Sequence, residues 1–159
     1  MAHVLGVDKD TGARVSHGRW KYEVSTVNGL LPKGAKIKEK EGLYIIDANT
    51  RVLMEEEGAP TITCYDFGKG KGIYMSSFQY NLENTRLLLN MILHAGGELK
   101  KAKYITDQVN TECAYYPESK TLIVINNSGE KQTTAVGLEK GEHKVSLEAY
   151  ETKIFHQIG

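Results

Sequence analysis

The stretch Tyr65–Gly97 constrains the fold more than any other part of this chain, because it reads as two strands followed by a capped helix. Asn81 is a favourable N-cap for a helix that begins at Leu82, and Glu83 complements the helix dipole in the first turn. Gly96-Gly97 then supplies a left-handed C-terminal stop. The i, i+3, i+4, i+7 pattern predicts a buried stripe of Leu88, Met91, Ile92 and Ala95. The stretch therefore predicts one α/β unit.

The glycine-lysine run Gly68–Gly72 within this stretch invites comparison with a phosphate-binding loop. Such a loop has the pattern G-x-x-x-x-G-K-[ST] and leads directly from a strand into a helix, whose N-terminus meets the anion. Here the glycines are followed by the strand candidate Gly72–Ser77, and the helix begins about ten residues later. The dinucleotide-binding fingerprint fails for the same reason. We interpret the run as a β-hairpin turn with its lysines in solvent.

The first 42 residues give a weaker signal than the stretch that follows. Val4–Val7 is a short apolar start, but Thr11–Glu41 is rich in glycine and contains only scattered apolar residues. So long a loop is unusual inside a compact domain, so this segment is typical of the tail of a larger domain. Short β-rich runs separated by turn residues come next. They are Leu43–Ile46, Arg51–Glu56, Pro60–Tyr65 and Gly72–Ser77.

After Gly97 the pattern changes to short strand candidates with no helical period. They are Lys103–Thr106, Thr111–Tyr116, Thr121–Asn126, Lys131–Leu138, His143–Leu147 and Glu151–Ile158. Their spacing of about 8–12 residues favours a small all-β sandwich. Ile123–Ile125 lacks polar alternation, so its strand is predicted to be central. We place a domain boundary near Lys100–Lys103, which gives domains at residues 1–100 and 101–159.

Composition excludes several functional classes. The chain has 20 basic and 20 acidic residues and no block of like charge, so we expect neither nucleic acid nor a membrane as partner. The apolar run Leu87–Leu89 is too short to span a bilayer, and the N-terminus lacks a secretory signal. Cys64 and Cys113 are expected to be reduced core thiols of a cytoplasmic protein. Asn126–Ser128 is a formal glycosylation sequon, which we interpret as a hairpin turn.

Residues that often carry chemistry do not form a catalytic pattern. The histidines His3, His17, His94, His143 and His156 lack metal-ligand spacing. Ser76 and Ser77 lack the G-x-S-x-G elbow, and Glu55–Glu57 is interpreted as a solvated strand end. The loop Ser76–Asn81 joins a strand end to a helix start, where α/β proteins bind ligands, so it either contacts a sugar or neighbouring domain or only caps the helix. We predict no catalytic, cofactor-binding or metal-binding residue.

The sequence leaves two interpretations open for each of two residues. Trp20, the single tryptophan, either stacks on a sugar ring or fills the edge of a core. Arg86 lies one turn into the predicted helix and faces either solvent or an interface.

Several segments resemble the 1,3-β-galactosyl-N-acetylhexosamine phosphorylases, also called lacto-N-biose or galacto-N-biose phosphorylases, to which a galactosyl-rhamnose phosphorylase is closely related. The segments are His3–Asp8, Gly68–Ser76, Tyr80–Leu88, Val124–Asn127 and Leu147–Phe155. Tyr-x-x-Glu-Asn-x-Arg-Leu-Leu, at Tyr80–Leu88, is the most specific of them. The Gly-Lys-Gly turn alone also suits the trimerisation domain of microbial β-galactosidases. The Thr11–Glu41 stretch departs from the family pattern.

The resemblance implies that residues 1–100 belong to the later half of a flavodoxin- or amidotransferase-like α/β domain. Residues 101–159 would form a small Ig-like β-sandwich. In that family an N-terminal TIM-like barrel carries the active site and its acidic general acid. No catalytic residue is therefore carried over to this chain, and no cofactor is implied. Inorganic phosphate is a co-substrate of the parent family.

The leading functional hypothesis is a non-catalytic C-terminal portion of a β-galactoside phosphorylase. The parent reaction splits galactosyl-β-1,3-N-acetylhexosamine with phosphate into galactose 1-phosphate and the hexosamine. This portion would support and partner the N-terminal catalytic barrel, and a homo-oligomer is expected. One alternative is a stand-alone carbohydrate-binding module that uses Trp20, Tyr115, Tyr116 and Tyr150. Another is an oligomerisation piece of a microbial β-galactosidase.

Overall fold

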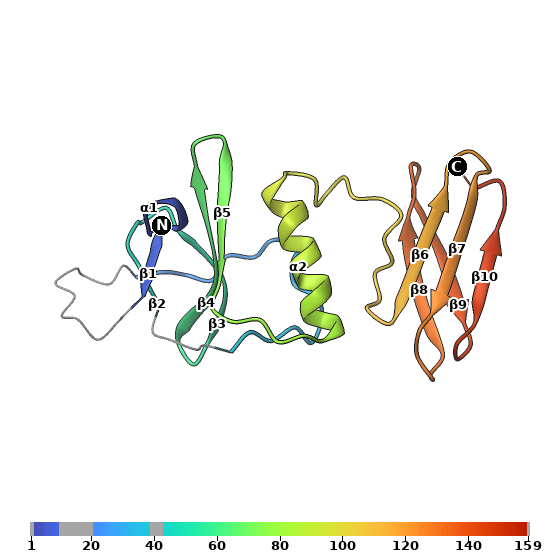
Figure 1. The fold of residues 1–159 in the computed structure, drawn as a ribbon, viewed down its shortest axis with the longest axis horizontal. Coiled ribbons are helices and arrows are strands. Elements are labelled where there is room, and N and C mark those ends of the chain that lie inside the picture. The colour runs from blue at the N-terminus through green and yellow to red at the C-terminus, as the bar shows by residue number, and fades with distance from the viewer. Residues whose placement is uncertain (1, 10–20, 39–42, 159) are drawn as a thin grey trace. The chain divides into compact units, whose positions relative to one another are not determined.

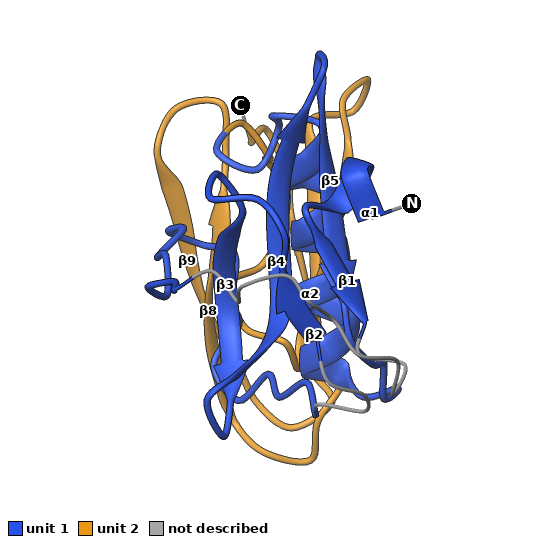
Figure 2. Ribbon diagram, turned by 90° about the vertical axis from the view of Figure 1, so that its left-hand side faces the viewer, with its two compact units in different colours: residues 1–100 blue, residues 101–159 orange. Residues whose placement is uncertain are grey.

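A computed structural model describes residues 2–9, 21–38 and 43–158. The chain divides into two compact units, Met1–Lys100 and Lys101–Gly159, coloured separately in Figure 2. Trp20, His17 and much of the loop-rich Thr11–Glu41 stretch lie outside the described residues.

The first unit is built on an antiparallel sheet with strand order β3-β4-β5 (Figure 1). Its strands are β3 (Arg51–Glu56), β4 (Ala59–Phe67) and β5 (Gly70–Met75). A short helix α1 (Ala2–Leu5) precedes a second, two-stranded antiparallel sheet of β1 (Val7–Lys9) and β2 (Leu43–Ile45). The helix α2 (Leu82–Ala95) follows β5.

This arrangement differs from the flavodoxin- or amidotransferase-like unit that the sequence predicts, because the ladders among the described strands are antiparallel. Tight turns explain the difference. Glu57 and Gly58, at φ 52° and 79°, join β3 to β4, and Gly68-Lys69 joins β4 to β5. A two-residue turn can connect only antiparallel neighbours, since a parallel pair needs a long crossover. Among the residues that the structure describes, parallel geometry occurs at an isolated bridge between Val24 and Val52.

The central sheet is covered on both faces. One face carries a core of Leu53, Ile62 and Cys64 with Leu87 and Met91 of α2, joined by Leu30 and Ile37 from the segment 27–38. The other carries Val52 with Val7, Leu43 and Ile45 of the β1–β2 sheet. Side chains alternate across a strand, so neighbouring residues of β3 serve opposite cores.

Helix α2 begins and ends where the sequence predicts, but it buries a different face. Asn81 is the N-cap and accepts a hydrogen bond from the Asn84 amide at 2.7 Å, and Gly97 adopts the left-handed conformation at φ 75°. The buried residues are Asn84, Leu87 and Met91. The predicted stripe is therefore wrong in part, since Leu88 and Ile92 are 38% and 62% exposed. Two apolar pairs lie side by side on this helix, Leu87 with Met91 and Leu88 with Ile92, so the spacing alone does not decide which pair is buried.

The second unit is all-β. The three-stranded sheet β10-β7-β6 consists of β6 (Thr111–Tyr116), β7 (Thr121–Asn126) and β10 (Thr152–Phe155), and the two-stranded sheet of β8 (Gln132–Gly137) and β9 (Glu142–Leu147). Leu122, Val124, Val136, Val145 and Leu147 form the shared core between them. The central position predicted for the strand through Ile123–Ile125 is confirmed.

One strand predicted for this unit does not form. Lys103–Thr106 forms an isolated bridge between Thr106 and Val136, beside a backbone hydrogen bond from the Tyr104 amide to the Gly137 carbonyl at 2.8 Å, but no continuous ladder. Thr106 instead donates from its hydroxyl to the Thr111 carbonyl at 2.7 Å, and the Cys113 thiol donates to the Tyr104 carbonyl at 2.9 Å. Side chains thus satisfy backbone groups that a strand would pair, as Thr commonly does at loop positions.

Candidate functional site

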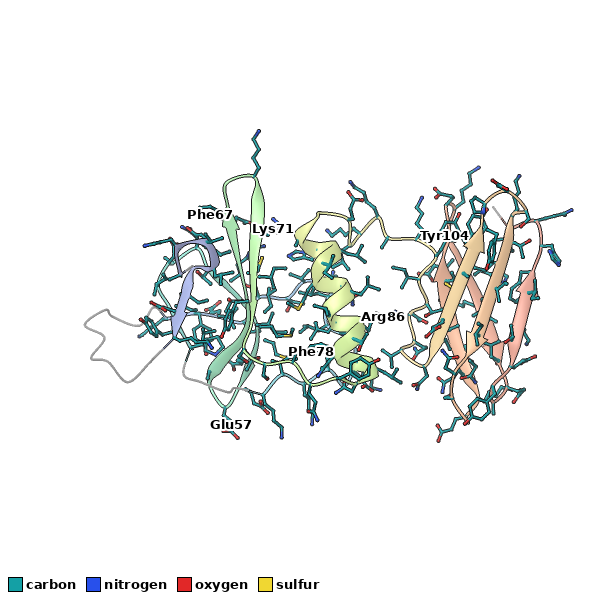
Figure 3. All side chains as sticks on the ribbon, in the orientation of Figure 1. Glu57, Phe67, Lys71, Phe78, Arg86 and Tyr104 are labelled. Atoms are coloured by element: carbon teal, nitrogen blue, oxygen red, sulfur yellow. The ribbon has the colours of Figure 1, made fainter. Side chains whose placement is uncertain are left out.

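The glycine-lysine run is a hairpin turn, as the sequence predicts. Gly68 lies at φ 58° between β4 and β5, and Phe67 pairs with Gly70. Lys71 forms an ion pair with Asp66 at 2.7 Å, and this hydrogen bond lowers the pKa of the Asp66 carboxyl. A strand follows the turn, so no helix N-terminus meets an anion here. The geometry therefore does not build a phosphate site. Figure 3 labels Phe67 and Lys71 in this hairpin.

Cys64, Arg51 and His94 form the only close group of a thiol, a guanidinium and an imidazole in the described part of the chain. The Cys64 Sγ is 3.4 Å from Arg51 Nη2 and 4.0 Å from His94 Nε2. Burial raises the pKa of the thiol, and burial also lowers the pKa of His94. A reactive cysteine needs a depressed pKa and some exposure, but Cys64 is fully buried. The group therefore acts as core packing and carries no nucleophile.

The strand-end loop Ser76–Asn81 uses most of its polar groups to hold local structure. The hydroxyls of Ser76 and Ser77 both donate to the Lys38 carbonyl, at 3.1 and 2.6 Å. Asn84, which is fully buried, donates to the carbonyls of Lys36 and Gln79. Of the two interpretations of this loop, capping accounts for these polar contacts.

Apolar exposure, in contrast, is concentrated at this loop and along α2. We call this set the α2 apolar surface; it consists of Phe78, Tyr80, Leu82, Leu88, Leu89 and Ile92, which are 38% to 86% exposed. Contiguous exposed apolar side chains mark interaction surfaces, whereas single ones do not. Figure 3 labels Phe78 and Arg86 at the N-terminal part of this surface. The sequence contains its signal, because Leu88 and Ile92 lie beside Leu87 and Met91 and widen the apolar side of the helix, but the predicted stripe assigned Leu88 and Ile92 to the core.

The other candidate residues do not converge on a site. No cluster of His, Cys, Asp and Glu suited to a metal ion exists in the ranges that the structure describes. His143 packs edge-on against Phe155 at 4.6 Å, and His156 lies 3.3 Å from the Thr121 hydroxyl. Glu55–Glu57 runs from the end of β3 into the turn.

The tyrosines proposed for sugar binding have mixed environments. Tyr115 stacks on Tyr104 at 4.0 Å and donates a hydrogen bond from its hydroxyl to the Ile158 carbonyl at 3.0 Å. Contacts within the unit therefore already occupy both its ring and its hydroxyl. Tyr116 and Tyr150 are 53% and 73% exposed. The sequon residue Asn126 is buried and donates to the carbonyls of Glu130 and Glu148, as expected of a turn.

One open polar depression of about 240 Å³ lies beside the β2–β3 turn of the first unit. Its lining comes from the segments 21–25 and 45–51 and includes Lys21, Glu23 and Arg51. The Arg51 guanidinium already contacts Asp66 at 3.3 Å. The lining presents no buried polar group without a partner, so it shows no ligand preference.

Comparison with known proteins identifies the family to which these two units belong. The lacto-N-biose phosphorylase central domain matches residues 1–101, and the lacto-N-biose phosphorylase C-terminal domain matches residues 104–155. The chain belongs to the lacto-N-biose phosphorylase family. The resemblance seen in the sequence is therefore confirmed.

Two curated relatives come from Lachnoclostridium phytofermentans. D-galactosyl-β-1→4-L-rhamnose phosphorylase is 44% identical over 97% of this chain and 21% of its own length. 1,3-β-galactosyl-N-acetylhexosamine phosphorylase Cphy3030 is 29% identical over 94% of this chain and 21% of its own length. The chain thus spans about a fifth of the length of these relatives.

The chain also has a distant likeness to a solved β-galactosidase structure. Gan42B, a GH42 β-galactosidase, aligns at 13% identity and a TM-score of 0.47, over 99% of this chain and 24% of that chain. At that score the likeness supports no argument. None of the described helices is long and apolar enough to cross a membrane.

Proposed function

We propose that this chain is a non-catalytic C-terminal portion of a β-galactoside phosphorylase, which supports the catalytic barrel of the complete enzyme. The observation that carries the proposal is the match to the central and C-terminal domains of one family, in that order, along a chain about a fifth as long as its relatives. The parent reaction is phosphorolysis of a galactosyl-β-1,3-N-acetylhexosamine or a related galactoside. It yields galactose 1-phosphate and the released sugar.

In this proposal residues 1–100 are the later half of a larger α/β domain of flavodoxin or amidotransferase type, to which they contribute antiparallel strands and the helix α2, and residues 101–159 are an Ig-like sandwich domain. The catalytic residues, and the phosphate that enters as co-substrate, belong to the barrel. The α2 apolar surface is the feature of the described residues best suited to a role in this proposal. An apolar surface fits a supporting part, because it gains free energy by packing against another domain.

A chimera tests the proposal. This chain replaces the matching segment of the Lachnoclostridium D-galactosyl-β-1→4-L-rhamnose phosphorylase, and release of galactose 1-phosphate is measured. The truncated relative and the isolated chain are the controls. We expect activity from the chimera and none from either control. Turnover by the isolated chain would refute the non-catalytic role, and a folded but inactive chimera would refute the supporting role.

A further inference from the structure

The free edge of β5 is the feature of the first unit that its own fold leaves unexplained. Ser76 donates its amide to the Thr61 carbonyl at 2.9 Å, and bonded pairs alternate along an antiparallel ladder. Gly72 and Tyr74 therefore bond to β4, whereas the amides and carbonyls of Lys71, Ile73 and Met75 point away from it. Among the described residues these three have no backbone partner, because β5 ends the sheet.

The two edge strands of this sheet, β3 and β5, differ in how well their outer edges are protected. At the β3 edge the ladder is irregular, and Ser25 donates its amide to the Val52 carbonyl at 2.7 Å. The β5 ladder is regular from Met75 to Gly70 and contains no proline. Natural sheets protect exposed edges with bulges, prolines, charges or covering loops. The only charge of this kind on β5, Lys71, is paired with Asp66 of the neighbouring strand.

Both faces of β5 are nevertheless covered, which is typical of an interior strand. Ile73 and Met75 pack against the core beneath α2. On the other face α1 lies so close that a Cβ on Gly72 would be 2.3 Å from the Val4 carbonyl oxygen. The β5 edge therefore combines outward-pointing backbone groups with a helix packed against each face of the strand.

Helix α2 extends the same argument. Its main strand contact is with β5. The helix also packs on β3 and β4 through Leu87 and Met91, so it covers the sheet from its interior to the β5 edge. Leu88 and Ile92, spaced i and i+4, are among the α2 residues left exposed, and Val4 of α1 is 41% exposed. Apolar side chains therefore remain uncovered in both helices that enclose β5.

We propose that the β5 edge accepts a further β-strand contributed by the part of the phosphorylase outside these 159 residues. This inference rests on the proposed function, because about four-fifths of each curated relative lies outside the match. The strand bonds to the outward groups of Lys71, Ile73 and Met75. It is apolar on both faces, since one face meets α2 and the other meets α1. Strand addition of this kind takes its affinity from main-chain bonds and its specificity from alternate side chains.

The test compares amide hydrogen exchange of the peptide covering Gly70–Ser76 in the chimera and in the isolated chain. We expect the Lys71, Ile73 and Met75 amides to exchange about a hundred-fold more slowly in the chimera. Unprotected amides in an active chimera would overturn the strand and leave the proposed function intact. Protection in the isolated chain that grows with concentration would assign the edge to a second copy instead, which also overturns the proposal.

Two substitutions at one position give a matched pair. Lys71→Pro removes the outward amide and blocks the edge, whereas Lys71→Ala also loses the lysine ammonium group and its methylene stem but keeps the amide. We expect the Lys71→Pro chimera to melt at a lower temperature than the Lys71→Ala chimera, while the two isolated chains melt alike. Equal melting of the two chimeras would overturn the proposal. This readout does not depend on activity, so it separates a missing strand from a missing catalytic partner.

Discussion

At the scale of single residues, Gly6 shows how closely the first unit is packed. It lies at φ 68°, and a Cβ there would be 2.1 Å from Thr50 Oγ1 and 2.8 Å from the Tyr65 ring. The Thr50 hydroxyl donates to the Gly6 carbonyl at 2.9 Å, and the Tyr65 hydroxyl donates to Asp47 at 3.0 Å. Any side chain at Gly6 would therefore disturb two hydrogen bonds, one buried and one partly buried, that hold α1 and the β2–β3 turn to the sheet.

Gly6→Ala is accordingly expected to destabilise the chain strongly. A left-handed conformation costs a non-glycine residue about 1–2 kcal/mol, and overpacking adds about 1–3 kcal/mol. Gly58→Ala is the matched control, because Gly58 lies at φ 79° with nothing near its Cβ position and meets only the first cost. Urea unfolding of both variants measures the difference. Equal losses would contradict the clash.

His94 gives a prediction for pH. Burial lowers its pKa below the ordinary 6.5, and the nearby Arg51 adds to the effect. At His94 the unfolded chain therefore binds a proton more readily than the folded chain. The contribution of His94 to the free energy of unfolding is fully present above pH 6.5 and is lost as the pH falls through the folded-state pKa. We expect His94→Gln to flatten this part of the curve of unfolding free energy against pH. A curve for the variant that still falls as steeply below pH 6.5 would be evidence against it.

At the scale of elements, the cap of α2 is the most testable feature. The backbone of Asn81 is extended, at φ −157°, and its side chain accepts a hydrogen bond from the Asn84 amide. Asn81→Ala should cost about 1 kcal/mol and Asn81→Gly only a few tenths, because glycine still suits the cap backbone. Denaturant midpoints of the two variants check this order. If alanine proved no worse than glycine, the side-chain cap would contribute nothing.

The sequence predicted correctly those elements whose ends are set by nearby turn and capping residues. The bounds of β3, β6 and β7 agree with the predicted runs, and α2 starts after its predicted cap. Turn residues fix hairpins within a few positions, so these elements depend little on distant contacts. The Gly-Lys turn was recognisable for the same reason.

The buried face of α2 depends on tertiary packing and was predicted wrongly in part. Two apolar stripes exist along the helix, and the one with Leu87 and Met91 includes the polar Asn84, which periodicity disfavours. Asn84 is acceptable there only because its amide bonds to the carbonyls of Lys36 and Gln79. Residue 36 is 48 positions away in sequence, so no local pattern predicts that contact. The α2 apolar surface was missed with it.

At the scale of the whole molecule, the two units have separate cores and should respond separately to core mutations. Leu87→Ala removes packing from the first unit and Val124→Ala from the second, at about 1–5 kcal/mol each. Residue-resolved NMR during denaturation should show that each substitution lowers the unfolding midpoint of its own unit. Equal shifts in both units for either variant would indicate one cooperative domain.

The α2 apolar surface gives the last prediction, at the scale of the assembled enzyme. Leu89→Glu and Ile92→Glu place charges on side chains that are 40% and 62% exposed, so the isolated chain should keep its melting temperature. In the chimera the same charges would be buried without a partner, which is costly, so melting temperature and activity should both fall. Leu87→Glu is the control, because Leu87 is fully buried and its substitution should unfold the isolated chain as well. If the chimera tolerated glutamate at both exposed positions, the α2 apolar surface would face solvent in the enzyme.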